Sequence, residues 1–142
     1  IISIAALLFI TGCKKKTDDS APSSQTTVKG QAKVESNLTS DGKENVPDGT
    51  KITFLINPND LLNKPDTSKK YDSYRYTAIV SAGQYTISLP VRNDGTKVKI
   101  VADDFEAQFV PYAGSSYRVV FSAPEDSITV YAGTTKFYDI NY

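Results

Sequence analysis

Alternation of apolar and polar residues with a period of two is the feature that most constrains the fold of this chain. From position 28 to 35, the even positions hold Val, Gly or Ala and the odd positions hold Lys, Gln or Glu. Such a segment buries one face and exposes the other, as a half-buried β-strand does. The same period recurs up to Tyr142 without a comparable helical period. We therefore expect an all-β domain over residues 26–142.

The alternating segments divide this domain into short strands. After the first strand we expect strands over 51–56, 74–81, 84–90, 97–102, 106–111, 117–122, 127–131 and 136–142, and one helical turn within 59–64. The residues expected to face the core are Ile52, Phe54, Ile56, Tyr85, Ile87, Leu89, Val98 and Ile100. Ala82-Gly83 predicts a tight turn, and Asn93-Asp94-Gly95 is the strongest hairpin signal. Short strands between Gly, Pro, Asn and Asp clusters predict an antiparallel Greek-key β-sandwich of seven or eight strands.

Charge and composition exclude several classes of function. Sixteen basic and sixteen acidic side chains give a net charge of zero, so no overall field attracts nucleic acid. The chain has no histidine, the usual general base and the commonest zinc ligand. We expect a non-catalytic protein with no cofactor, no metal site and no nucleic-acid partner.

Residues 1–12 form an uncharged, largely apolar run. Its length suits the hydrophobic region of a signal peptide and is too short to span a bilayer. No Met stands at position 1, and we expect a truncated signal peptide here. The alternative is a short buried helix in which the chain's single cysteine, Cys13, is an inert small hydrophobe.

The sequence Ile10-Thr11-Gly12-Cys13 resembles the lipobox of bacterial lipoproteins. The resemblance implies cleavage before Cys13, diacylglyceryl transfer to its thiol and acylation of the new amino terminus, which together hold a protein stably in a membrane. Residues 13–25 then form the lipidated cysteine and a flexible tether rich in Ser, Asp, Lys and Pro. Lys14 favours the outer membrane, and the pair Asp18-Asp19 resembles sorting signals of the Bacteroidota.

Three motifs in the domain resemble the carboxypeptidase regulatory-like domains, small sandwiches of transthyretin-like (prealbumin-like) type. The motifs are a Val-x-Gly element at 28–30, a Pro-Asp-Gly-Thr turn at 47–50, and the arm Gly-x-Tyr-x-Ile-x-Leu-Pro at 83–90. The resemblance covers 26 to about 110 and implies a non-catalytic module. The segments 57–73 and 112–142 depart from the family pattern.

Tyrosines provide the candidate ligand-binding residues. The densest group lies in the segment YDSYRY and comprises Tyr71, Tyr74, Arg75 and Tyr76. Tyrosine rings stack on sugars or on partner side chains at low entropic cost, and Arg adds polar contacts. The alternative is that Tyr74 and Tyr76, which share one strand face, join the core with Tyr85.

Two acidic groups are weaker candidates for chemistry. Asp103 and Asp104 are adjacent on an extended chain, so their side chains point to opposite faces and do not flank one bond. Asp41, Glu44 and Asp48 lie in an oxygen-rich loop, but the loop lacks the spacing of a calcium-binding EF-hand. An ordinary polar loop is the favoured interpretation.

Two functional hypotheses remain open. The first is a lipid-anchored cell-envelope protein whose sandwich is a binding or spacer module for a glycan or an envelope protein. The second is a structural or adhesin-type component that assembles through edge-strand contacts, with the C-terminal strand as the expected edge.

Overall fold

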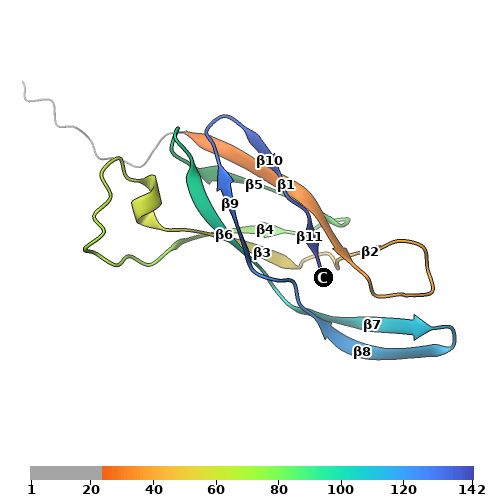
Figure 1. The fold of residues 1–142 in the computed structure, drawn as a ribbon. Helices are drawn as coiled ribbons and strands as arrows, with labels where there is room; N and C mark the ends of the chain where they lie inside the picture. Colours follow the sequence, from red (N-terminus) through yellow and green to blue (C-terminus); the bar gives the residue numbers. More distant parts are fainter. Residues whose placement is uncertain (1–23) are drawn as a thin grey trace, which may run out of the picture.

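The expected alternation produces strands from Gln25 to Asn141, separated by loops. A computed structural model describes residues 24–142, and those residues form an all-β sandwich with a separate two-stranded ribbon (Figure 1). The strands are β1 (Gln25–Val34), β2 (Glu44–Asn45), β3 (Lys51–Ile56), β4 (Tyr74–Ile79), β5 (Gln84–Pro90), β6 (Thr96–Ala102), β7 (Phe105–Tyr112), β8 (Ser115–Phe121), β9 (Asp126–Val130), β10 (Thr135–Phe137) and β11 (Ile140–Asn141). A single 3₁₀ turn, η1 (Pro58–Leu61), matches the expected helical turn. The predicted signal peptide lies outside the described residues, and so does nearly all of the tether.

The first sheet is built around β1. Strand β1 pairs antiparallel with β5 from Gln25 opposite Pro90 to Gln31 opposite Gln84, and its last residues pair with β2. On its other side it pairs with β10 and β11, and both of these pairings are parallel. The sandwich is therefore not wholly antiparallel, and the single strand expected over 136–142 is divided in two at Tyr138 and Asp139.

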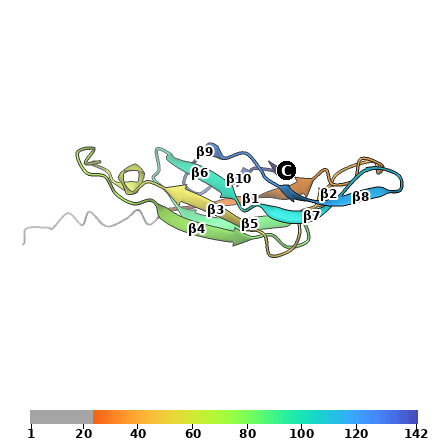
Figure 2. The same ribbon diagram turned by 90° about the horizontal axis from the view of Figure 1, so that it is seen from below.

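The second sheet has the strand order β4-β3-β6-β9, and all its pairings are antiparallel. Phe54 of β3 lies opposite Tyr76 of β4 and Ile100 of β6, so apolar residues of three strands share one face. In Figure 2 the strands β3, β4 and β6 of this sheet lie in front, and β1 of the first sheet lies behind them.

The core lies between the two sheets. Its largest fully buried side chains are Phe54, Ile52, Ile56 and Leu89. The ring of Phe54 packs on that of Tyr85 across the layers, with centroids 6.0 Å apart. The residues expected to face inward do so, although Ile87 is only partly buried. Fully burying one such side chain contributes about 1.5–3 kcal/mol, so this alternation accounts for much of the stability.

Two tight turns connect the sheets instead of closing hairpins within a sheet. Ala82 and Gly83 both have positive φ, as the predicted tight turn requires, but β4 belongs to the second sheet and β5 to the first. The turn at Asn93-Asp94-Gly95 likewise joins β5 to β6 of the other sheet. The hairpin prediction at this second turn is therefore wrong. Turn residues fix where the chain reverses, whereas burial decides which strand it pairs with.

The C-terminal segment closes the first sheet at Gly30. The backbone N–H of Tyr138 donates to the carbonyl of Lys29 at 3.0 Å, and the N–H of Gln31 donates to Asp139 Oδ1 at 2.8 Å. The buried Tyr85 hydroxyl donates to the Tyr138 carbonyl at 2.5 Å. A Cβ atom at position 30 would overlap that carbonyl, so only glycine allows the segment to approach. We call this arrangement the Gly30–Tyr138 contact.

We predict that Gly30→Ala destabilises the protein by about 3 kcal/mol, the upper end of overpacking costs, because Tyr138 must move away from β1. Urea unfolding measures the change. Gly114→Ala is the control, because a Cβ there meets nothing within 4 Å and the positive φ of Gly114 costs only about 1–2 kcal/mol. Equal losses in the two variants would contradict the Gly30–Tyr138 contact.

Two C-terminal tyrosines connect this segment to β9 of the second sheet and to the residues that follow β6. The Tyr138 hydroxyl donates to Asp126 Oδ2 at 2.7 Å, and the Tyr142 hydroxyl donates to the carbonyl of Asp103 at 2.8 Å. Burial, aided by the Asp126 carboxylate, raises the pKa of Tyr138 to about 12. Burial, aided by Asp103 and Asp104, raises the pKa of Tyr142 to about 12.

These raised pKa values predict a loss of stability in alkali. The unfolded chain loses the tyrosine protons near pH 10.0, whereas the folded protein keeps them until about pH 12. The stabilisation is therefore complete below pH 10 and is lost as the pH rises towards 12. The double variant Tyr138→Phe/Tyr142→Phe is expected to show a shallower decline in unfolding free energy. Tyr112→Phe is the control for an exposed tyrosine, and an identical pH profile for the wild type and the double variant would refute the assignment.

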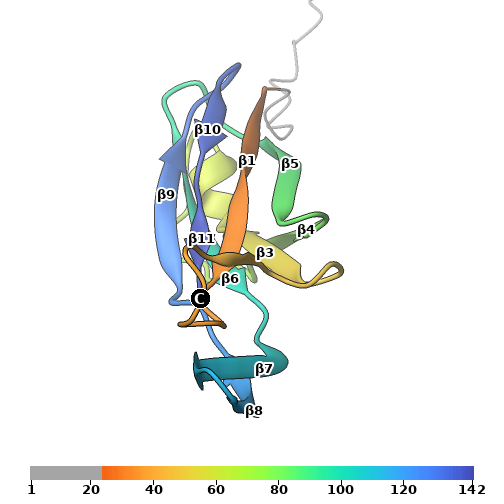
Figure 3. The ribbon, with the colours of Figure 1, turned by 90° about the vertical axis from the view of Figure 1, so that its right-hand side faces the viewer.

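Strands β7 and β8 leave the sandwich as a ribbon of their own, which we call the arm (105–121). In Figure 3 the arm lies at the end of the molecule opposite to the beginning of β1. The loop 57–73 lies at the same end as the beginning of β1 (Figure 1). The loop 57–73 and the arm therefore lie at opposite ends of the molecule.

Candidate functional site

The structure separates the four residues of the predicted tyrosine site. Tyr71 ends the long loop with 38% of its surface exposed, and Tyr74 begins β4 with 51% exposed. Tyr76 packs against the core beside Phe54, and this burial raises the pKa of its hydroxyl. Arg75 alternates with Tyr74 and Tyr76 along the strand, so its side chain leaves the sheet on the opposite face. Tyr71 and Tyr74 are the two rings of the set that are available to a ligand.

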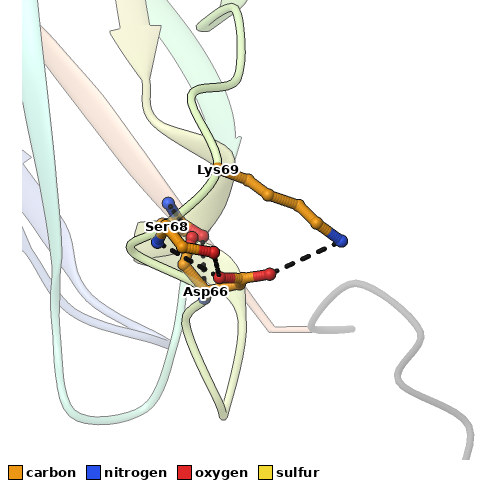
Figure 4. Close-up of polar contacts among 4 residues, drawn as sticks. Asp66, Ser68 and Lys69 are labelled. Carbon is orange, nitrogen blue, oxygen red and sulfur yellow. Dashed lines mark hydrogen bonds and ion pairs between the residues drawn. The ribbon is translucent and has the colours of Figure 1, made fainter.

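The loop before these tyrosines is folded by its own side chains. Asp66 Oδ1 accepts hydrogen bonds from the Ser68 hydroxyl at 2.5 Å and the Ser68 N–H at 3.1 Å, as Figure 4 shows. The hydrogen bond from the Ser68 hydroxyl lowers the pKa of Asp66. Lys69 lowers it further, with its Nζ 3.5 Å from Asp66 Oδ2. Asn59 of η1 bonds the Asp66 backbone through both amide atoms, at 3.2 and 3.3 Å. These polar groups therefore order the loop from within.

Two of the three carboxylates in the oxygen-rich loop at 41–48, those of Glu44 and Asp48, accept structural hydrogen bonds. Glu44 accepts from both the N–H and the hydroxyl of Ser36 and from the hydroxyl of Ser40, at 2.9–3.1 Å. Asp48 accepts from the N–H of Ala82 at 2.7 Å and so fixes the turn between the sheets. Over residues 24–142, no three His, Cys, Asp or Glu side chains lie close enough together to hold a metal ion.

A shallow groove of about 540 Å³ lies beside the Gly30–Tyr138 contact. Its floor includes Gly30 and Tyr85, and the exposed side chains of Ile79 and Phe137 contribute apolar walls. The Lys29 ammonium lies 4.9 Å from the centre of the Phe137 ring, within the range of a cation–π interaction. The groove therefore combines these apolar side chains with polar ones, among them Gln31, Gln84 and Asp139.

The arm carries an aromatic face and a polar face. From Phe105 to Phe109, each residue of β7 lies opposite a residue of β8, and opposite residues point to the same face of the ribbon. The period of two therefore sets the two faces. The aromatic face comprises Phe105, Ala107 and Phe109 of β7 with Phe121, Val119 and Tyr117 of β8. On the polar face, Arg118 Nε donates to Glu106 Oε1 at 2.6 Å.

Contacts at its base hold the arm to the sandwich. Phe105 packs against Phe121 and Tyr142, with ring centroids 5.5 and 4.8 Å away. Further out, the Val110 N–H donates to the Ser36 carbonyl at 2.8 Å, and the Val110 carbonyl accepts from the N–H of Leu38 at 2.9 Å. The β7 side of the arm is therefore joined to the loop that follows β1.

Sequence reasoning predicted the strands of the arm but not their departure from the sandwich. Beyond its base, Tyr112, Tyr117 and Val120 are 52–66% exposed. The alternation of large aromatic residues in 105–121 signalled a pair of strands, but it did not indicate whether a second sheet covers them. Cys13, the predicted lipidation site, lies outside the described residues.

Comparison with known proteins leaves function to be argued from the structure. The sequence matches no model of a known protein family, and a search of characterised proteins gives no match. Among residues 24–142, no helix has the length and hydrophobicity needed to cross a bilayer.

Proposed function

We propose that this chain is a non-catalytic, lipid-anchored protein of the bacterial cell envelope, located at the outer membrane. Its sandwich is a spacer that presents a binding surface away from the membrane. The lipobox-like sequence ending in Cys13 and the resemblance to carboxypeptidase regulatory-like domains support both parts of the proposal.

One geometric observation carries the proposal. Strand β1 begins at Gln25, the last residue of the expected tether, and the arm lies at the opposite end of the molecule (Figure 3). If Cys13 is held in a membrane, the sandwich separates the arm from that membrane. An isolated two-stranded ribbon buries little surface of its own, so an arm that exposes Tyr112, Tyr117 and Val120 is best explained as a contact surface.

Metabolic labelling with a fatty-acid probe tests the anchor. Cys13→Ser is expected to abolish labelling and to move the protein from the membrane fraction to the soluble fraction, because the acylated thiol supplies the membrane attachment. Lys14→Ala, next to the reacting residue, is the control and should label normally. Labelling that persists in Cys13→Ser would refute the anchor.

A glycan ligand is a second candidate, favoured by the exposure of Tyr71 and Tyr74. Both rings lie near the start of β4, and sugar rings stack on exposed tyrosine faces. The loop 57–73 lies at the tethered end, so such a ligand would be bound close to the membrane.

A glycan array tests this second candidate. Binding should fall at least about tenfold in Tyr71→Ala/Tyr74→Ala if each ring contributes a stacking contact of about 1 kcal/mol. Tyr131→Ala is a matched control, since Tyr131 is 50% exposed and Tyr74 is 51% exposed. Equal binding by both variants would exclude these tyrosines as the glycan site.

A further inference from the structure

Strand β8 presents an edge that lacks the usual protection against pairing. Within residues 24–142 it has a strand partner on one side only, β7. Edge strands are commonly protected by Lys, Pro or a bulge, but β8 reads SSYRVVF, and the register irregularity lies between Phe109 and Tyr112 of β7. Its single charge, Arg118, is paired with Glu106.

Other edges of the sandwich are less available. Strand β9 carries Asp126, whose carboxylate accepts the Tyr138 hydroxyl, and Glu125 just before it is paired with Lys99. Strand β4 leads directly into the Ser81–Gln84 bridge that takes the chain to the first sheet. The C-terminal strands β10 and β11, where the sequence predicted an assembly edge, also pair on one side only, with β1, but they are only three and two residues long. Strand β5 likewise pairs only with β1, and it ends in Pro90, which has no N–H to donate. Among these edges, β8 is the best suited to an additional strand.

We propose that β8 pairs antiparallel with β8 of a second copy of this chain, with Val119 on the two-fold axis. Tyr117 then lies opposite the partner's Phe121, and Arg118 opposite the partner's Val120. Paired positions are both odd or both even, so the aromatic faces of the two arms become one face of a four-stranded sheet. The alternative axis at Arg118 would place two arginines opposite each other, which disfavours it.

The occupant is a second copy because antiparallel self-pairing places side chains that favour each other in register. Tyr117 of each copy faces Phe121 of the other, and the two Val119 side chains face each other, so the pairs are of the aromatic and β-branched kinds that stabilise sheets. The contact is isologous and closes as a dimer. Antiparallel pairing also directs the two sandwiches away from each other, with the residue-24 ends outermost. The proposal deepens the proposed function, since it rests on the arm as the contact surface and names its partner.

Charge substitutions at position 120 test the register. In the full-length chain carrying Cys13→Ser, Val120→Glu should tighten the dimer and Val120→Lys should weaken it, because each faces the partner's Arg118. The dissociation constants from sedimentation equilibrium should differ by about tenfold over the two symmetric pairs. Within one chain, position 120 lies opposite Glu106, so a simple effect on arm stability would have the reverse order. Equal constants, the reverse order or a monomeric protein would overturn the proposal.

Cysteine cross-linking tests the axis directly. In the same Cys13→Ser background, Val119→Cys should form disulfide-linked dimers on mild oxidation, because the two Cβ atoms lie about 5 Å apart. Ser116→Cys is the control, since residues 116 of the two copies would be about 20 Å apart along the strands. Equal cross-linking of the two variants, or none, would overturn the proposal. Because this background carries no lipid, failure here is separate from failure of the anchor.

Discussion

The close approach of Tyr138 to Gly30 is the contact on which the rest of the structure depends. It places the C-terminal segment beside β1, which is thereby paired along both edges. The same segment ends at Tyr142, whose ring packs on Phe105 where the arm begins. One glycine therefore allows the first sheet to close and gives the arm a fixed base. Any side chain at position 30 would push the C-terminal segment away from β1. The first sheet would then lose the pairing along one edge of β1, and the arm would lose its fixed base.

The sequence predicted the parts of this fold that depend on local chemistry. A period of two identifies the buried faces of β1, β3 and β6 because each strand contributes one side to the same core. It could not identify sheet membership, since Asn93-Asp94-Gly95 reverses the chain equally well within a sheet or between two sheets. The parallel pairing of β10 and β11 with β1 likewise depends on distant residues, the Tyr85 hydroxyl among them.

The candidate sites show the same division. The shared face of Tyr74 and Tyr76 follows from alternation, and so does the separation of Arg75 from both. The exposure of Tyr74 depends on its place at the start of an edge strand, which the pattern does not specify. Alternation in the arm looks the same whether a second sheet covers it or water does. For that reason the sequence pointed to a strand pair, and the structure was needed to identify a projecting surface.

Native-state hydrogen exchange measured by nuclear magnetic resonance tests the central contact most directly. The N–H groups of Tyr138 and Tyr142 donate to the carbonyls of Lys29 and Lys33, so both should exchange as slowly as the buried N–H groups of β3. Rapid exchange at these two residues in a protein whose β3 stays protected would show that the C-terminal segment does not close the first sheet. That result would contradict the account of the sandwich and of the base of the arm together.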